Sequence, residues 1–239
     1  YKKWTTVLDA LLYVKSYMDP SVAIRYSCRM ASCGSCGMKI NGMPKLACYT
    51  KISELETSTI ECEPLSNFPI IRDLVTDFSR FFDHHKSMEP YIESNDGNED
   101  DTNKGTFSFY QSREDVDNYL QFSYCIKCGL CYSACPTVGT DVNFPGPQAL
   151  AQQYRYFADT RDESKKRLDI VDDRHGIWRC HFAGSCSKVC PKGVDPALGI
   201  QLLKSYMLGI SKNDKVPAKK IEIDSINDSN DSKGSSNTE

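Results

Sequence analysis

The distribution of cysteines constrains this chain more than any other feature. Twelve cysteines occur in 239 residues; five lie between Cys28 and Cys62, and seven lie between Cys125 and Cys190. The repeated C-x2-C spacing favours metal binding over disulfide bonds. A secreted disulfide scaffold fits poorly, because such scaffolds are short chains with small cores, whereas this chain has amphipathic segments that can build a core. Thiolate ligands in turn indicate a reducing compartment.

The first set of cysteines has the spacing C-x4-C-x2-C, with a fourth cysteine after eleven further residues. Its members are Cys28, Cys33, Cys36 and Cys48. This is the plant-type ferredoxin spacing for a 2Fe–2S cluster, in which two irons take two thiolates each. A structural zinc site is the alternative, but zinc sites favour paired C-x2-C knuckles. The spacing therefore predicts a 2Fe–2S site.

The second set has the spacing C-x2-C-x2-C-x3-C-P, which is the bacterial ferredoxin signature. Its members are Cys125, Cys128, Cys131 and Cys135, followed by Pro136. In two-cluster ferredoxins the first three thiolates hold one 4Fe–4S cluster, and the cysteine before proline serves the other cluster.

The third set is an incomplete copy of the second. It contains Cys180, Cys186 and Cys190, and Ala183 stands where a full copy would have cysteine. The two sets therefore offer seven thiolates, whereas two complete cubanes need eight. One 4Fe–4S and one 3Fe–4S cluster would satisfy this count, although water or hydroxide as a fourth ligand is an alternative.

Crossed ligation then divides the seven cysteines between the two clusters. The predicted 4Fe–4S ligands are Cys125, Cys128, Cys131 and Cys190. The predicted 3Fe–4S ligands are Cys135, Cys180 and Cys186.

Four other residues with chemically reactive side chains receive mostly ordinary interpretations. Cys62 lies outside every ligand spacing and is expected to be a small buried strand residue. His84 and His85 follow an aromatic helical face and are expected on its solvent side. His181 follows a predicted ligand directly, and sequence alone favours equally a packing role and a hydrogen-bonding or proton-relay role beside the cluster.

Hydrophobic periodicity and turn signals predict the local structure. A capping box at residues 6–9 begins a helix that stops before Pro20. A hairpin is expected with strands at 38–40 and 46–49, followed by a strand at 57–62. Further helices are expected after Pro69 over 70–82, at 111–122, at 147–158 and from Asp195 as N-cap to Gly209.

Composition excludes some functions. Lys and Arg number 29 and Asp and Glu 32, so a net charge of -3 gives no reason to expect nucleic-acid binding. No run reaches the roughly 18 apolar residues of a membrane span, so any membrane anchor is expected to come from a partner. With no GxGxxG motif, Walker loop or nucleophile–base pair, the sequence predicts an electron carrier without catalytic residues. Because Tyr1 is not methionine, the sequence is expected to begin inside a longer product or after processing.

The three cysteine sets, in this order, resemble the iron–sulfur subunits of succinate dehydrogenase and fumarate reductase. The resemblance covers roughly residues 1–208. The segments that carry it are 27–37 (SCRMASCGSCG), 67–75 (NFPIIRDLV), 125–136 (CIKCGLCYSACP), 154–162 (YRYFADTRD) and 180–191 (CHFAGSCSKVCP). Many succinate dehydrogenases carry tryptophan shortly after the Cys-Pro pair; residues 137–144 contain none and are closer to fumarate reductases and archaeal forms.

This resemblance implies an α+β fold with two cluster domains. Residues 1–92 would form a β-grasp, plant-type 2Fe–2S ferredoxin domain lacking its opening strands, with a connecting helix. Residues 93–110 would be an acidic linker, 111–210 an all-helical bacterial-type ferredoxin domain for the 4Fe–4S and 3Fe–4S clusters, and 211–239 a disordered polar tail.

The resemblance also implies partners and a place in metabolism. A FAD-containing flavoprotein subunit would interconvert succinate and fumarate in the tricarboxylic acid cycle or respiration. Electrons would pass between it and a membrane quinone, with Pro136 and His181 near the quinone and with one or two membrane anchor subunits. The chain would lie peripherally on the cytoplasmic face of a prokaryotic membrane, or on the matrix face of the mitochondrial inner membrane.

Two other functions are open at this point. One is the iron–sulfur subunit of another flavoprotein dehydrogenase, although such systems favour other cysteine-rich partners. The other is a free ferredoxin, although free ferredoxins are usually much shorter and strongly acidic. The direction of the succinate–fumarate reaction depends on the quinone and cluster potentials rather than on these motifs.

Overall fold

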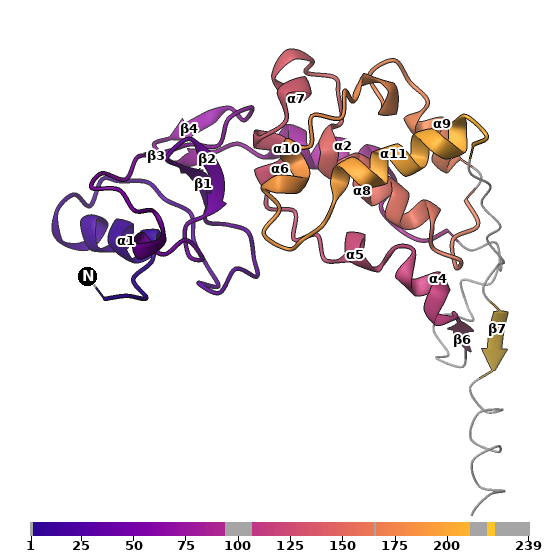
Figure 1. The fold of residues 1–239 in the computed structure, drawn as a ribbon, viewed down its shortest axis with the longest axis horizontal. Helices are drawn as coiled ribbons and strands as arrows, with labels where there is room; N and C mark the ends of the chain where they lie inside the picture. The colour runs from indigo at the N-terminus through magenta and orange to yellow at the C-terminus, as the bar shows by residue number, and fades with distance from the viewer. Residues whose placement is uncertain (1, 94–106, 165, 211–218, 223–239) are drawn as a thin grey trace, which may run out of the picture.

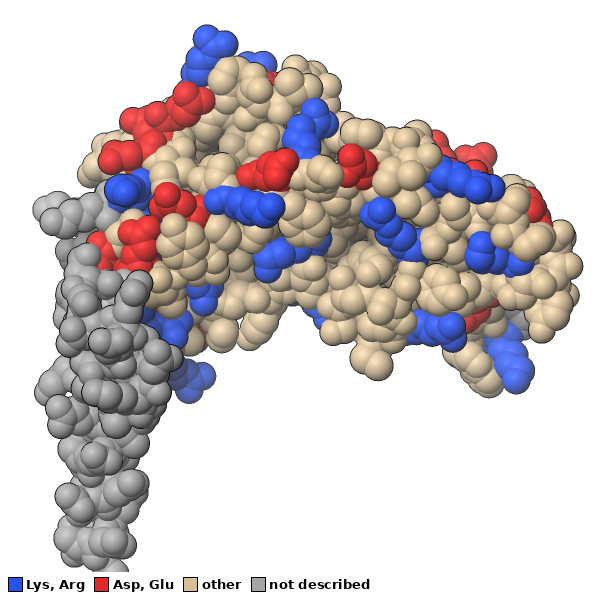
Figure 2. All heavy atoms as spheres, turned by 180° about the vertical axis from the view of Figure 1, so that it is seen from behind, with Lys and Arg blue, Asp and Glu red and all other residues tan. Residues whose placement is uncertain are grey.

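The computed structural model describes residues 2–93, 107–164, 166–210 and 219–222. A smaller part at the N-terminus combines one helix with short strands, and a larger part is built mainly of helices (Figure 1). Basic and acidic side chains are interspersed over the face shown in Figure 2.

The first helix, α1 (Val7–Tyr17), begins at the predicted capping box. The Thr6 hydroxyl accepts a hydrogen bond from the Asp9 amide at 3.2 Å, and the Asp9 carboxylate accepts one from the Thr6 amide at 2.9 Å. Two amides that would lack partners at a helix start are satisfied in this way. The helix buries Val7 and Leu8 against the N-terminal core, which confirms the predicted helix.

A three-stranded antiparallel sheet lies beside α1, with strand order β2-β1-β3. Its strands are β1 (Gly37–Ile40), β2 (Met43–Leu46) and β3 (Cys62–Glu63). Asn41 and Gly42 have φ angles of 49° and 77°, which suit a tight hairpin turn. The hairpin is confirmed, but the predicted strand at 46–49 is wrong, because the Tyr49 and Thr50 amides turn back to the Leu46 carbonyl.

The predicted helix over 70–82 is wrong in its first half. The chain forms an antiparallel pair, β4 (Ile70–Arg72) and β5 (Val75–Thr76), and α2 (Ser79–Ser87) begins only afterwards. The turn is held from outside the hairpin, because the Asp73 carboxylate accepts a hydrogen bond from the Ala23 amide at 2.8 Å. With φ of 46°, Asp73 also interrupts any helix there.

The larger part contains eight α-helices within the described residues. They are α4 (Arg113–Asp117), α5 (Leu120–Ser123), α6 (Leu130–Ser133), α7 (Pro136–Thr140), α8 (Gly146–Phe157), α9 (Arg167–Val171), α10 (Ser185–Lys188) and α11 (Pro196–Met207). Single 3-10 turns lie at Ile52–Glu54 and Ile177–Arg179. The predicted helix at 111–122 is two short helices, whereas those at 147–158 and after Asp195 are confirmed, with Asp195 accepting from the Leu198 amide at 2.9 Å.

Helix α8 is the centre of the helical core. It packs against α11, α5, α2, α6 and α9. Phe122, Leu150, Ile200 and Leu203 are completely buried there. The cysteine-bearing loops are therefore laid over a packed scaffold.

Two polar side chains join segments on either side of residues 94–106, which lie outside the described part of the chain. The Asn67 amide donates to the carbonyls of Tyr132, Ser133 and Cys135 at 2.9, 3.1 and 3.1 Å. Arg167 donates to the carbonyls of residues 88, 89 and 91 and to the Asp162 carboxylate. Because the acceptors are mainly backbone atoms, these contacts fix the backbone around Cys135 relative to Asn67, and the segment after α2 relative to α9.

The C-terminal segment differs from the predicted disordered tail over 211–239. Strand β7 (Lys219–Glu222) pairs antiparallel with β6 (Phe107–Tyr110), with Phe107 opposite Glu222 and Tyr110 opposite Lys219. A polar segment can pair in this way because the ladder joins backbone groups rather than side chains. Strand β6 also occupies the end of the predicted acidic linker at 93–110, whereas residues 94–106 of that linker and the rest of the tail lie outside the described residues.

Candidate iron–sulfur sites

Three members of the first cysteine set lie on a tightly wound loop between α1 and β1, and the fourth, Cys48, follows β2. Arg29, Ala31 and Gly34 have φ angles of 56°, 56° and 77°, so successive peptide groups turn toward the inside of the loop. The amides of residues 30, 32 and 33 lie 3.4, 3.3 and 3.2 Å from the Cys28 sulfur, and the Ala31 amide lies 3.3 Å from the Cys48 sulfur. The loop therefore offers several N–H donors to sulfur, an arrangement that suits a negatively charged cluster.

The thiols of this loop have contrasting environments. Hydrogen bonds from the Ser35 side chain and from the backbone lower the pKa of the exposed Cys33 to about 6. Burial raises the pKa of Cys36 to about 12. Metal binding requires thiolates, so loading iron onto this loop is expected to release protons.

The same loop touches the second cysteine set. A Cβ atom built on Gly34 would lie 2.7 Å from the Cys128 Cβ, and one on Gly37 would lie 3.2 Å from Leu130. With its φ of 77°, Gly34 is a position where only glycine fits without strain. The first two sets are consequently in van der Waals contact.

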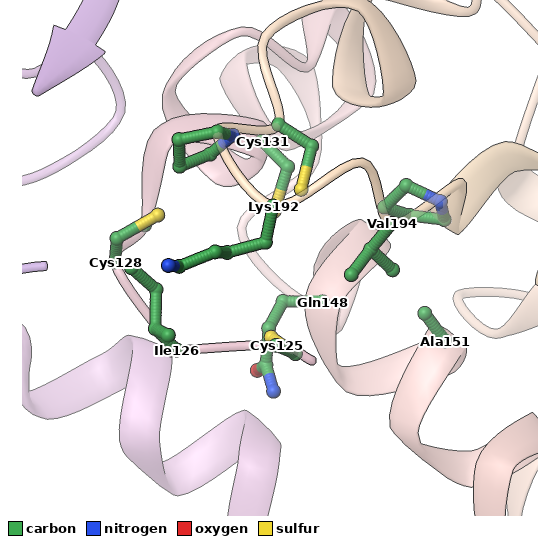
Figure 3. A pocket seen from close by; sticks show the side chains of 12 residues that line it. Cys125, Ile126, Cys128, Cys131, Gln148, Ala151, Lys192 and Val194 are labelled. Atoms are coloured by element: carbon green, nitrogen blue, oxygen red, sulfur yellow. The ribbon is translucent and has the colours of Figure 1, made fainter. Parts of the chain in front are cut away.

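The second set opens onto a cavity at one end of α8. Cys125, Cys128 and Cys131 line it, and so does Cys190 from the third set (Figure 3). Four thiols around one space match the donor set of a 4Fe–4S cluster. Burial raises the pKa of Cys128 to about 11 and that of Cys131 well above its usual range.

A second cavity gathers the remaining thiols. Cys135 from the second set lines it together with Cys180 and Cys186, and Ala183 lies on the same wall. Burial raises the pKa of Cys186 to about 11. Pro136, His181 and Phe182 line this cavity, and the Phe182 side chain is also exposed on the surface.

The backbone shows why Ala183 occupies a special position. Lys127 and Gly129, on either side of Cys128, have φ angles of 54° and 77°. Phe182 and Gly184, on either side of Ala183, have φ angles of 57° and 72°. Each pattern leads directly into a short helix, α6 or α10, so Ala183 is the backbone equivalent of Cys128.

Other predicted residues have varied outcomes. Cys62 lies in a strand, as expected, but is only half-buried. The solvent-side prediction is wrong for His85, which is 8% exposed because α2 packs that side chain against α8. His84 is half-buried, and His181 lines the second cavity.

Two cavity residues were missed by the sequence reasoning. Lys192 lines the first cavity, and its closeness to Cys190 in the sequence is a local signal for this position. Gln148 also lines that cavity, but it stands 13 residues after Cys135, the nearest cysteine before its own helix, and only the packing of α8 brings it there.

Two further features concern single-metal sites and membrane-spanning helices. No group of three or more His, Cys, Asp or Glu side chains among the described residues is arranged to hold a metal ion. None of the described helices is both long enough and apolar enough to cross a membrane.

Comparison with known proteins gives matches in both halves of the chain. Residues 1–83 match the 2Fe-2S iron-sulfur cluster binding domain, and residues 121–194 match the 4Fe-4S dicluster domain. The fold and sites thus define an iron–sulfur protein with a 2Fe–2S domain followed by a dicluster domain.

Named relatives narrow this class. The fumarate reductase iron-sulfur subunit of Haemophilus influenzae is 43% identical over 224 residues, covering 89% of this chain and 87% of that protein. The subunit of the same name from Escherichia coli O6:H1 is 46% identical, covering 84% and 80%. The mitochondrial succinate dehydrogenase [ubiquinone] iron-sulfur subunit of Dictyostelium discoideum is 38% identical, covering 84% and 71%.

A solved structure agrees with these relatives. A chain of the Mycobacterium smegmatis Sdh1 complex in the apo form superimposes with a TM-score of 0.75 at 25% identity, covering 90% of each chain. This chain belongs to the family of the iron–sulfur subunits of fumarate reductase and succinate dehydrogenase, and its function is electron transfer.

Proposed function

We propose that this chain relays single electrons between a FAD-containing flavoprotein subunit and a membrane quinone, within a complex that interconverts succinate and fumarate. The observation that carries this proposal is the spatial order of the three thiol sets. The 2Fe–2S loop touches Cys128 of the first cavity, and the second cysteine set contributes to both cavities. Because each cluster site adjoins the next, the arrangement suits the stepwise transfer of electrons from one site to another.

The proposal includes the ligands of each cluster. Cys28, Cys33, Cys36 and Cys48 hold a 2Fe–2S cluster. Cys125, Cys128, Cys131 and Cys190 hold a 4Fe–4S cluster. Cys135, Cys180 and Cys186 hold a 3Fe–4S cluster. Support comes from the grouping of the thiols around the two cavities and from the backbone equivalence of Ala183 with Cys128.

When bound, iron–sulfur clusters supply one-electron redox chemistry over a wide range of potentials. The protein fixes the positions of the thiols and places hydrogen-bond donors around their sulfur atoms. In the first loop the amides of residues 30–33 supply N–H groups to the sulfurs of Cys28 and Cys48. In the helical part, apolar side chains such as Val194 and Ile200 line the cavities and exclude water.

The finer architecture is part of the same proposal. Residues 1–92 form a β-grasp, plant-type ferredoxin domain with its connecting segment, and residues 111–210 form a bacterial-type ferredoxin domain. The flavoprotein subunit and the membrane anchor are separate chains, and the complex lies on the cytoplasmic or matrix face of its membrane. Pro136 and His181 lie near the quinone, because both line the cavity assigned to the 3Fe–4S cluster.

The overall test is to purify the chain with its partners from membranes and to follow stepwise reduction by electron paramagnetic resonance. Three paramagnetic centres and succinate–quinone or fumarate–quinol activity are expected. Zinc without iron in the purified chain would overturn the proposal.

The sharpest test of the ligand assignment is Ala183→Cys. A thiolate at the position equivalent to Cys128 is expected to bind a fourth iron, so that the oxidised 3Fe–4S signal disappears and a 4Fe–4S centre of lower potential replaces it. Ala183→Val is the matched control, because it adds bulk without a ligand. A full oxidised 3Fe–4S signal in Ala183→Cys would show that this position does not determine the cluster type.

A further inference from the structure

A buried histidine–glutamine pair lies behind the first cavity. His85 on α2 is 8% exposed and Gln148 on α8 is 2% exposed. The His85 Nδ1 atom and the Gln148 Nε2 atom are 3.2 Å apart. The pair therefore joins the last turn of α2 to the first turn of α8, deep in the protein.

The direction of this hydrogen bond follows from the two atoms that face each other, because an amide nitrogen can only donate. Burial, together with the positive charge of Lys127, lowers the pKa of His85 to about 4. The imidazole is consequently neutral near pH 7, and its Nδ1 atom can accept a hydrogen bond. The Gln148 amide donates one of its two hydrogens to Nδ1, which fixes which end of the amide faces His85.

The second hydrogen of the same amide is available to the cavity. Gln148 lines the space enclosed by Cys125, Cys128, Cys131 and Cys190, and Figure 3 shows its side chain beside Cys125. Among the described residues the Gln148 Oε1 atom has no hydrogen-bond partner, and the hydrogen bond to His85 is made by the amide nitrogen.

We propose that Gln148, oriented by His85, donates a hydrogen bond to the Cys125 sulfur and raises the reduction potential of the cluster held in the first cavity. This inference rests on the proposed 4Fe–4S cluster at that position. Reduction adds negative charge to the cluster and its thiolates, and a donor aimed at a ligand sulfur stabilises the reduced form more than the oxidised form. Gln148 is thus a residue that sets the potential, and His85 is the residue that positions it.

The experiment is a redox titration of the intact complex, followed by electron paramagnetic resonance, for wild type and variants. Gln148→Leu keeps most of the side-chain volume and removes both donors. It is expected to shift the reduction equilibrium of the 4Fe–4S centre about tenfold toward the oxidised form, which is 59 mV for a one-electron couple. His85→Leu frees the amide without touching the cavity, and a smaller shift in the same direction is expected.

The same helix supplies a matched control. Gln152 on α8 is also buried, but its amide donates to the Phe122 carbonyl at 2.8 Å and does not line the cavity. Gln152→Leu is expected to leave the 4Fe–4S potential unchanged, even if the protein becomes less stable. The 2Fe–2S potential, measured in the same samples, is expected to stay constant in all variants.

The outcomes separate this inference from the proposed function. A 4Fe–4S centre that is present in Gln148→Leu with the wild-type potential overturns the inference and leaves the proposed function standing. If Gln148→Leu does not retain its cluster, His85→Leu decides, and an unshifted potential there overturns the inference. Absence of any 4Fe–4S signal in the wild-type complex overturns the proposed function itself.

Discussion

Replacing Arg167 with methionine is expected to weaken the protein by disconnecting the segment after α2 from α9. Arg167 is 1% exposed, and its guanidinium lies 2.7 Å from one oxygen of Asp162 and 3.1 Å from the other. It also donates to the carbonyls of Glu89 and Tyr91, each at 2.5 Å. One side chain therefore joins the segment after α2 to the start of α9.

The size of the effect follows from what methionine would leave behind. The Asp162 side chain is itself 1% exposed, so Arg167→Met strands a buried carboxylate without its cation. Removing one partner of a buried ion pair typically costs about 3–5 kcal/mol. Because methionine fills much of the same space, little of this loss comes from an empty cavity, and we expect a loss of about 3 kcal/mol or more in the free energy of unfolding.

Equilibrium urea denaturation of the cluster-loaded protein, followed by circular dichroism, measures this loss. Arg113→Met is the matched control, because the Arg113 side chain is 94% exposed and lies 3.8 Å from Asp117. An exposed pair of this kind contributes at most about 1 kcal/mol. If Arg167→Met cost no more than Arg113→Met, the interpretation of Arg167 as a buried clamp would be wrong.

Three further variants test other parts of the structure. Asn67→Leu removes a donor to three carbonyls around Cys135, and we expect a loss of about 1–3 kcal/mol in urea denaturation, because buried acceptors stay unpaired. Cys190→Ser is expected to abolish the 4Fe–4S signal before the 3Fe–4S signal, because Cys190 lines the first cavity; a spectrum lacking only 3Fe–4S would refute the crossing. Cys62→Ala is expected to keep all three paramagnetic centres with a small loss of stability, and a missing 2Fe–2S signal would show that its ligands are misassigned.

Local features of the sequence predicted much of this protein. The spacing of the cysteines within each loop, the capping box before α1 and the Asp195 cap of α11 depend on neighbours a few residues apart. Such interactions can be read along the chain, because their partners are set by backbone geometry over one or two turns. For the same reason, the alanine at position 183 stood out against the repeated cysteine pattern.

Long-range packing decided the rest. The apolar spacing of residues 70–82 suits a helix, but hydrogen bonds with residues 21 and 23 hold its first part as a hairpin. The sequence pattern placed His85 on the solvent side of its helix, but α8 buries it in the structure. No nearby residue in the sequence indicates that Gln148 lies beside Cys125. These positions depend on contacts between residues that are far apart in the sequence, 63 positions in the case of His85 and Gln148, and no local pattern encodes such contacts. The free energy of burying α2 against α8 selects them only when the whole chain has folded.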